Sequence, residues 1–149
     1  SIYTYWKRSA PAPNMQIFDA PTREICVMKR PRTNTPLQAL VTMNDTQFVE
    51  AARMLAQRAM KEGGATAESQ GRYAFELATA RKPNALEIAT IDKVYKRAFT
   101  KYLTSPDLAK QLLQVGEAKR DEALPVAEHA ALTNGTSMIL NLDETLTRE

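Results

Sequence analysis

A helix-start signal at residues 35–38 divides this sequence into an irregular first part and a helical remainder. Thr35 is a good N-cap, because its hydroxyl can accept a hydrogen bond from a backbone N–H of the first turn. Pro36 then occupies the first helical position, where its missing N–H costs nothing. Gln38 follows three residues after Thr35, so the two side chains can form a capping box. We therefore expect a helix to begin at residue 36.

A second start signal follows at once. Asn44 can cap a helix with Gln47 as its capping-box partner, and Met43 and Phe48 are placed as a hydrophobic staple. The sequence therefore predicts a short helix, a sharp bend and then a long helix.

Apolar residues recur at helical spacing through the rest of the chain, which indicates further helices. We predict them at about residues 45–61, 67–81, 84–103, 105–116 and 125–142. Leu77 is expected to face the protein core. Asn84 and Glu87 are expected to form another capping pair. Gly135 costs stability inside the last helix relative to alanine, so we expect it to allow a close helix contact. The predicted fold class is all-α: an irregular bundle of about five to six helices with an extended Pro-rich N-terminal arm.

The chain of 149 residues is close to the size of one domain. We expect an extended arm at residues 1–35 and a helical body at residues 36–149, together forming the C-terminal part of a larger protein. Residues 25–27 could form a short strand or an extended tether. An irregular arm of this length is unusual in a compact domain. It either lies across the helices or packs against another part of the parent protein. The first arrangement is preferred, because exposed aromatic residues would form an apolar patch. The aromatic anchors would be Tyr3, Tyr5, Trp6 and Phe18.

Few residues fit the requirements of catalysis or cofactor binding. The chain has one histidine, His129, and one cysteine, Cys26. Zinc and haem sites need more ligands than this, so we expect no metal and no cofactor. Cys26 has no local partner that would activate a thiol.

The charge of the chain does not favour nucleic-acid binding. The net charge of +3 and the pI near 9.1 are only mildly basic, and basic and aromatic residues do not alternate as they do in nucleic-acid binders. We therefore expect no nucleic-acid partner. No apolar run approaches the length of about 18 residues that a membrane span needs.

Basic residues cluster in the predicted arm. They could tie the arm to backbone carbonyls through their several donors, or form an anion or carboxylate site, because the guanidinium group is a bidentate fork. The cluster comprises Lys7, Arg8, Arg23, Lys29, Arg30 and Arg32.

Two carboxylates follow the last predicted helix, at Asp143 and Glu144. A helix C-terminus is partly negative, so a positive group should compensate them. We hypothesise that one of these carboxylates pairs with Arg23, Arg30 or Arg32 and locks the arm onto the last helix; Arg148 is another candidate. Asp19, Glu24 and Asn34 complete the set of candidate anion-binding or arm-locking residues.

The same residues carry a family resemblance. The segments Phe18-Asp19-Ala20-Pro21, Arg23-Glu24, Arg32 to Leu40, Asn44-Asp45 and Phe48 to Ala52 closely resemble the planctomycete-type C-terminal domain of unknown function, the "PSD" domain. Cys26 and Arg30 also fit this pattern. Trp6-Lys7-Arg8 and Leu140 to Glu144 look like the two ends of the same family. Residues 77–83 fit less well, because the family more often has glycine and proline at positions 80 and 82.

The resemblance implies a setting rather than an activity. Such domains lie at the C-terminal end of large exported bacterial proteins, which often carry a cytochrome-c-like haem domain elsewhere. It therefore implies a cell-envelope location. The family's activity is unknown, so the resemblance assigns no catalytic residue.

Three functions remain open at this point. The leading hypothesis is a non-catalytic helical module that docks onto other domains of its parent. A second is part of an enzyme active site completed by an upstream segment, with Asp19, Arg23, Glu24 and Arg30 contributing. A third is a carbohydrate-binding module that stacks sugars on Tyr3, Tyr5 and Trp6. A small-molecule or polysaccharide ligand fits the last two.

Overall fold

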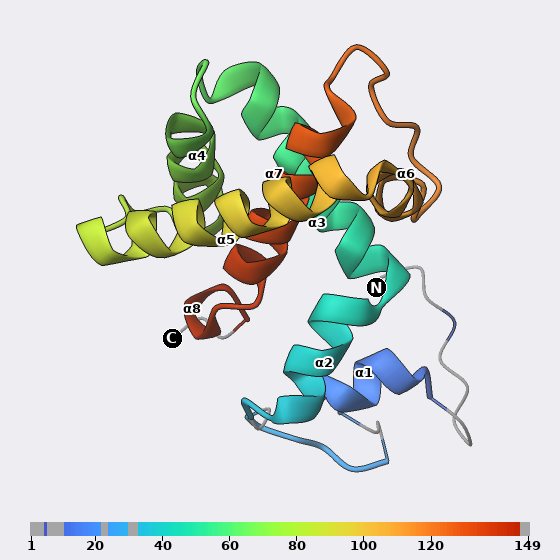
Figure 1. The fold of residues 1–149 in the computed structure, drawn as a ribbon. Coiled ribbons are helices and arrows are strands. Elements are labelled where there is room, and N and C mark those ends of the chain that lie inside the picture. The colour runs from blue at the N-terminus through green and yellow to red at the C-terminus, as the bar shows by residue number, and fades with distance from the viewer. Residues whose placement is uncertain (1–4, 6–10, 22–23, 30–32, 147–149) are drawn as a thin grey trace. The chain divides into compact units, whose positions relative to one another are not determined.

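The computed structural model describes residues 5, 11–21, 24–29 and 33–146. These residues form eight helices and no strand, which confirms the predicted all-α class (Figure 1). Their contacts divide the chain into two compact units, unit 1 at residues 1–41 and unit 2 at residues 42–149. The helices are α1 (Pro13–Ile17), α2 (Pro36–Asn44), α3 (Thr46–Glu62), α4 (Ala67–Thr79), α5 (Ala85–Thr104), α6 (Pro106–Leu113), α7 (Val126–Leu140) and α8 (Asp143–Leu146).

The predicted helix starts are mostly confirmed. Thr35 and Gln38 form the expected capping box, with Gln38 N donating to Thr35 Oγ1 and Thr35 N donating to Gln38 Oε1. Asn84 and Glu87 form another at the start of α5. The prediction of Asn44 as a cap is wrong. Asn44 is the last residue of α2, and Asp45, with an extended backbone, accepts from the backbone N–H two residues later. A carboxylate suits this end of a helix, because the helix dipole is positive there.

The described part of the arm contains a short helix that the sequence did not reveal. Pro13 occupies the first position of α1, where proline is favoured. Ala12, just before it, has the extended backbone expected of a residue that precedes proline. Residues 25–27 form no strand, so the strand alternative is wrong.

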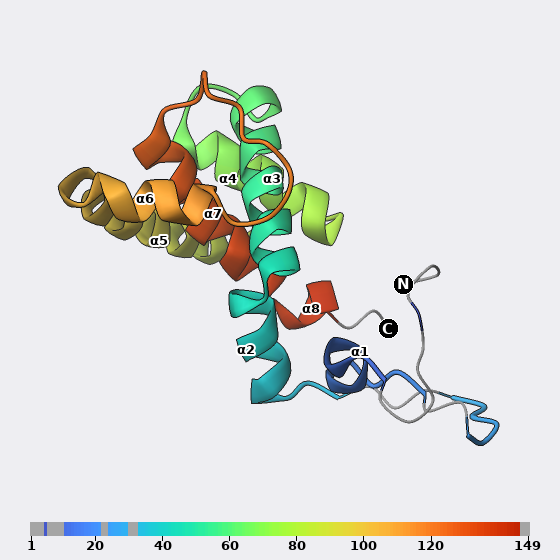
Figure 2. The same ribbon diagram turned by 90° about the vertical axis from the view of Figure 1, so that its right-hand side faces the viewer.

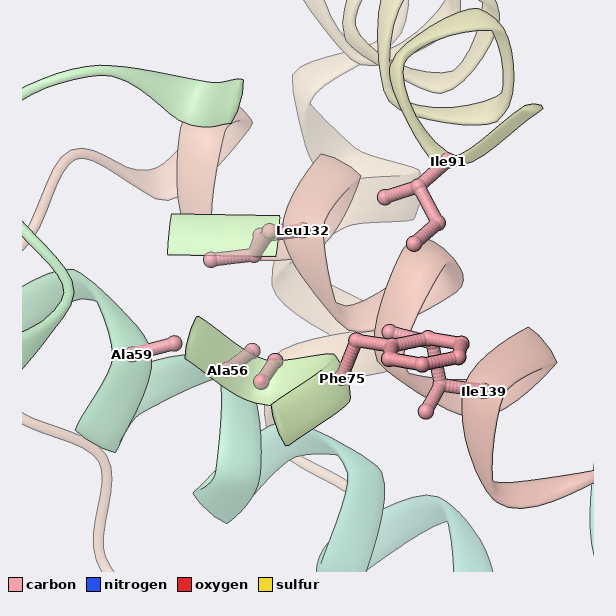
Figure 3. Packing of buried hydrophobic residues seen from close by; sticks show 7 residues of the cluster. Ala56, Ala59, Phe75, Ile91, Leu132 and Ile139 are labelled. Atoms are coloured by element: carbon pink, nitrogen blue, oxygen red, sulfur yellow. The ribbon is translucent and has the colours of Figure 1, made fainter. Parts of the chain in front are cut away.

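Helix α7 runs through the middle of unit 2 and packs against α3, α4, α5, α6 and α8 (Figure 1). Its buried residues lie on all sides of the helix, as expected for a helix surrounded by others. One core cluster joins α7 to α3, α4 and α5, and a second joins it to α5 and α6. In the first cluster, Phe75 of α4, Ile91 of α5 and Ile139 of α7 converge (Figure 3).

The buried face of α4 differs from the prediction, which placed Leu77 inside and did not include Phe75. Gly71, Ala74 and Phe75 are buried, whereas Leu77, expected inside, is exposed. The line of residues 71, 74, 75 and 78 follows the spacing of one helix face, and position 77 falls beside it.

The glycine that permits a close helix contact is Gly71 rather than Gly135. A Cβ atom on Gly71 would lie 2.9 Å from Ile91 Cγ2 of the neighbouring helix α5. A Cβ atom on Gly135 would lie 3.9 Å from the same atom, an ordinary contact distance. The expectation for Gly135 is therefore wrong, because its helix leaves room for a methyl group.

The segment between α6 and α7 passes along α3 (Figure 2). Four polar residues on one face of α3 bond to it, and these are Glu50, Arg53, Gln57 and Lys61. The carboxylate of Glu50 accepts from the backbone N–H groups of Glu117 and Ala118, at 3.1 and 2.6 Å. Gly116 has φ +96° and comes so close to Glu50 that no Cβ atom would fit. Polar contacts therefore hold this connection in place, whereas apolar packing holds the helices together.

Candidate interaction site

Gln38 on α2 organises the described part of unit 1. Gln38 is buried, with only 3 % of its surface exposed to solvent. Its Nε2 donates to the Ile17 carbonyl at 2.8 Å and to Thr33 Oγ1 at 3.1 Å, and it lies 3.5 Å from Asp19 Oδ2. Its Oε1 accepts from Thr35 N. One amide side chain therefore ties the end of α1, the segment before α2 and α2 itself together.

Asp19 supports the same network. Its backbone is left-handed, with φ 55°, a conformation that aspartate tolerates better than most residues. Its Oδ2 accepts from Thr33 N at 2.9 Å and from Thr33 Oγ1 at 2.7 Å. Asp19 thus locks two parts of the arm to each other.

Of the other predicted site residues of the arm, the structure describes only two. Glu24 and Asn34 are exposed. Arg23, Arg30 and Arg32 lie outside the described residues. The predicted pairing of these arginines with Asp143 or Glu144 therefore stays a prediction, as does any role for Arg148.

Within unit 2, the carboxylate of Glu144 is bound by Arg81. Arg81 Nε and Nη2 donate to its two oxygens at 2.9 and 2.7 Å. The same guanidinium donates to both oxygens of Glu87, at 3.0 and 2.6 Å. The Arg81 guanidinium, followed by the Asn84 backbone N–H, lowers the pKa of Glu87 to about 2. The carboxylates after α7 signalled a missing cation, but no local pattern could identify Arg81, which lies 63 residues away.

The lone histidine is part of the interior of unit 2. His129 is fully buried, and its Nε2 donates to the Arg53 carbonyl at 3.1 Å. Burial lowers the pKa of His129, and the positive charges of Arg120 and Arg53 act in the same direction. Nothing about this position suggests a ligand role.

The buried Arg53 was not anticipated from the sequence. Its Nη2 donates to the Ala118 carbonyl at 2.6 Å, and the Glu50 carboxylate lies 3.8 Å away. The repeat of polar residues at positions 50, 53, 57 and 61 was the available signal, because these positions share one face of α3.

Unit 1 differs from unit 2 in its apolar side chains. Every buried apolar side chain among the described residues belongs to unit 2, between Ala52 and Ile139. The described part of unit 1 instead exposes large apolar side chains, which are Tyr5, Ile25, Val27, Met28, Leu37 and Leu40. Leu37 and Leu40 are three residues apart on α2 and so share a face of that helix. Hydrogen bonds, rather than an apolar core, organise the described part of unit 1.

The described part of the chain contains no group of three or more histidine, cysteine, aspartate or glutamate residues that could hold a metal ion. None of its helices is long and apolar enough to cross a membrane.

A family model covers the first two thirds of the chain. The model is PSD1, described as a protein of unknown function (DUF1553), and it matches residues 1–95. The match spans unit 1 and continues into α5. Comparisons with curated proteins and with solved structures gave no match.

Proposed function

Because the chain belongs to the PSD1 family of proteins of unknown function (DUF1553), we propose that it is a non-catalytic helical interaction module that docks onto another domain of its parent protein through unit 1. The observation that carries this proposal is the distribution of apolar side chains. The described residues of unit 1 bury none and expose several large ones. A covering partner would supply the missing core.

The energetics favour such a partner. Removing apolar surface from water stabilises a complex by about 25 cal/mol per Å². Scattered exposed apolar residues are normal on a soluble protein. The described residues of unit 1 depart from this norm because none of their apolar side chains is buried, whereas burial is the main force that holds folded chains together.

The hydrogen-bond network around Gln38 favours the same reading. Its contacts with Ile17, Thr33 and Thr35 link described segments of the arm to α2 before any partner binds. Preordering reduces the conformational entropy that is lost on binding and so favours affinity.

The partner we propose is another domain of the same protein, in the cell envelope. The support for this setting is the family resemblance, which implies that further domains precede this one in exported proteins. The exposed apolar residues of unit 1 support the docking itself and leave the identity of the partner domain open to experiment.

The test is calorimetric titration of this chain with the remainder of its parent, produced separately. We expect binding with a negative heat-capacity change, the signature of apolar burial. Leu40→Glu on α2 should weaken the binding at least tenfold. Leu103→Glu on α5 is the matched control, because the two leucines are 55 % and 61 % exposed and belong to different units.

Two outcomes would contradict the proposal. One is no detectable binding by the native chain while it melts sharply on its own. The other is equal weakening by the Leu40 and Leu103 substitutions, which would mean that unit 1 holds no particular docking surface.

A further inference from the structure

A small apolar pocket opens in unit 2, where α4, α5 and the end of α7 meet. Its cavity volume is about 180 Å³. It is lined by Phe75, Leu86, Glu87, Thr90, Ile91, Met138, Ile139 and Leu142. We propose that this pocket is a binding site for a small uncharged molecule of the size of one aromatic ring. The proposal is independent of the proposed function, because no residue of unit 1 lines the pocket.

The two polar residues in the lining already make hydrogen bonds to the protein. Thr90 Oγ1 donates to the Leu86 carbonyl at 2.8 Å, within its own helix. The Glu87 carboxylate accepts from Arg81 and from the Asn84 backbone N–H. Sites for polar ligands usually carry a few converging polar groups that fix the orientation of the ligand. Here the remaining lining is hydrocarbon and the Met138 thioether, so the ligand is expected to be uncharged and apolar.

The volume limits the size of this ligand. Pockets for drug-sized molecules and cofactors measure about 300–1,000 Å³, so a nucleotide or a haem does not fit. An enclosed apolar cavity of about 150 Å³ can bind benzene. The present pocket is slightly larger and is open to solvent beside Leu86 and Thr90, which leaves room for a single ring with a short substituent.

The surrounding structure holds the pocket open. Phe75, Ile91 and Ile139 belong to the buried core and converge from three helices (Figure 3). The Arg81 guanidinium lies 4.8 Å from the centre of the Phe75 ring and binds Glu87 and Glu144. Glu144 lies two residues after Leu142, which lines the pocket. The ion pairs of Arg81 with Glu87 and Glu144 therefore hold the chain at the edge of the pocket. The cavity is therefore a built feature of the packing between α4, α5 and α7.

The test is a titration of the full chain with toluene, followed by ¹³C methyl NMR. We expect saturable shifts at the methyl groups of Ile91, Met138 and Ile139. The methyl groups of Leu103 and Leu113, which do not line the pocket, should not respond. Benzoate, a ring of similar size with a charge, should produce no such shifts, because its carboxylate would lose its hydration without gaining a partner.

A pair of substitutions on α5 makes the test specific. Thr90 and Thr100 are both exposed, and the hydroxyl of each donates to the carbonyl four residues earlier. Only Thr90 lines the pocket. Thr90→Phe should fill the mouth and weaken toluene binding at least tenfold, whereas Thr100→Phe should leave it unchanged. Should Thr90→Phe lower the melting temperature, Thr90→Leu is the smaller plug, with the same expectation.

The proposal is overturned by either of two results. The first is no shift at the pocket methyl groups when toluene is near its solubility limit. The second is an unchanged toluene response in a folded Thr90 variant, which would place the binding elsewhere.

Discussion

The imidazole of His129 donates to the backbone oxygen of Arg53 across 3.1 Å, and so joins the only histidine of the chain to a buried arginine. A carbonyl can only accept, so the neutral ring carries its proton on Nε2. Nδ1 has no hydrogen-bond partner among the described residues. Adding a proton there would place a second positive charge beside Arg53 in the interior.

This arrangement predicts a dependence of stability on pH. The pKa of His129 is lowered in the folded protein, so below the ordinary histidine value of about 6.5 the unfolded chain binds a proton that the folded chain does not. The free energy of unfolding should therefore fall as the pH is lowered from 7 to 5. Urea denaturation at several pH values measures this slope.

The control is His129→Gln, which keeps an N–H donor for the Arg53 carbonyl and does not titrate. In this variant the free energy of unfolding should change much less between pH 7 and 5. An unchanged slope would mean that another group causes the dependence.

Replacing Gly71 or Gly135 by alanine should have opposite effects on the stability of the protein. Gly71→Ala should destabilise the protein, because its methyl group would lie 2.9 Å from Ile91 Cγ2; overpacking typically costs about 1–3 kcal/mol. Gly135→Ala should be neutral or stabilising, since alanine is favoured over glycine in a helix by about 1 kcal/mol. Thermal melts of the two variants compare them directly. If Gly135→Ala had the lower melting temperature, the description of the α4–α5 contact would be wrong.

The ion pairs around Arg81 predict loss of stability in acid. The pKa of Glu87 is lowered to about 2 in the folded protein, chiefly by Arg81. The stabilisation from Glu87 is therefore complete above the ordinary glutamate range and disappears as the pH falls from about 4.5 to 2. Glu87→Gln should reduce the pH dependence of unfolding in this range. Glu122→Gln, on the exposed connection before α7, serves as the control and should reduce it less.

The hydrogen-bond network around Gln38 predicts that Gln38→Glu, a nearly isosteric change, weakens the structure of the described part of the arm. Gln38→Glu replaces the Nε2 donor by an oxygen that faces the Ile17 carbonyl and the Asp19 carboxylate. Leaving a buried polar group unsatisfied typically costs about 1–3 kcal/mol. Amide hydrogen exchange should therefore become faster at Thr33 and Thr35.

Gln16→Glu introduces the same charge at an exposed position of α1 and is the matched control. Exchange in this variant should stay close to that of the native chain. Equal exchange in both variants would show that Gln38 does not hold the arm.

Local sequence signals predicted much of this fold because they act over a few residues. The capping boxes at Thr35 and Asn84 depend only on a residue three positions later, and both are present in the structure. The starts of α2, α4, α5 and α6 lie close to the predicted positions. The one wrong cap, Asn44, differs from the true cap by a single residue, because both Asn and Asp cap helices well.

Relationships between distant residues could not be read from the sequence. Arg81 and Glu144 are 63 residues apart, and Arg53 and His129 are 76 apart. No periodicity specifies such pairs, since they depend on how the helices pack. The same holds for Gly71, whose need for a small side chain arises only from the approach of Ile91 on another helix.

The central place of α7 has a consequence for the order in which this protein can fold. Thr136 of α7 donates to the carbonyl of Ala52 on α3, 84 residues earlier. During synthesis α3, α4 and α5 leave the ribosome before the helix that covers their apolar faces has been made. Contacts over such sequence distances form slowly, and chains with uncovered apolar faces tend to aggregate. A fragment that ends at residue 95, where the family match ends, would keep those faces uncovered permanently. Unit 2 can therefore acquire its complete interior only after residue 140 has emerged.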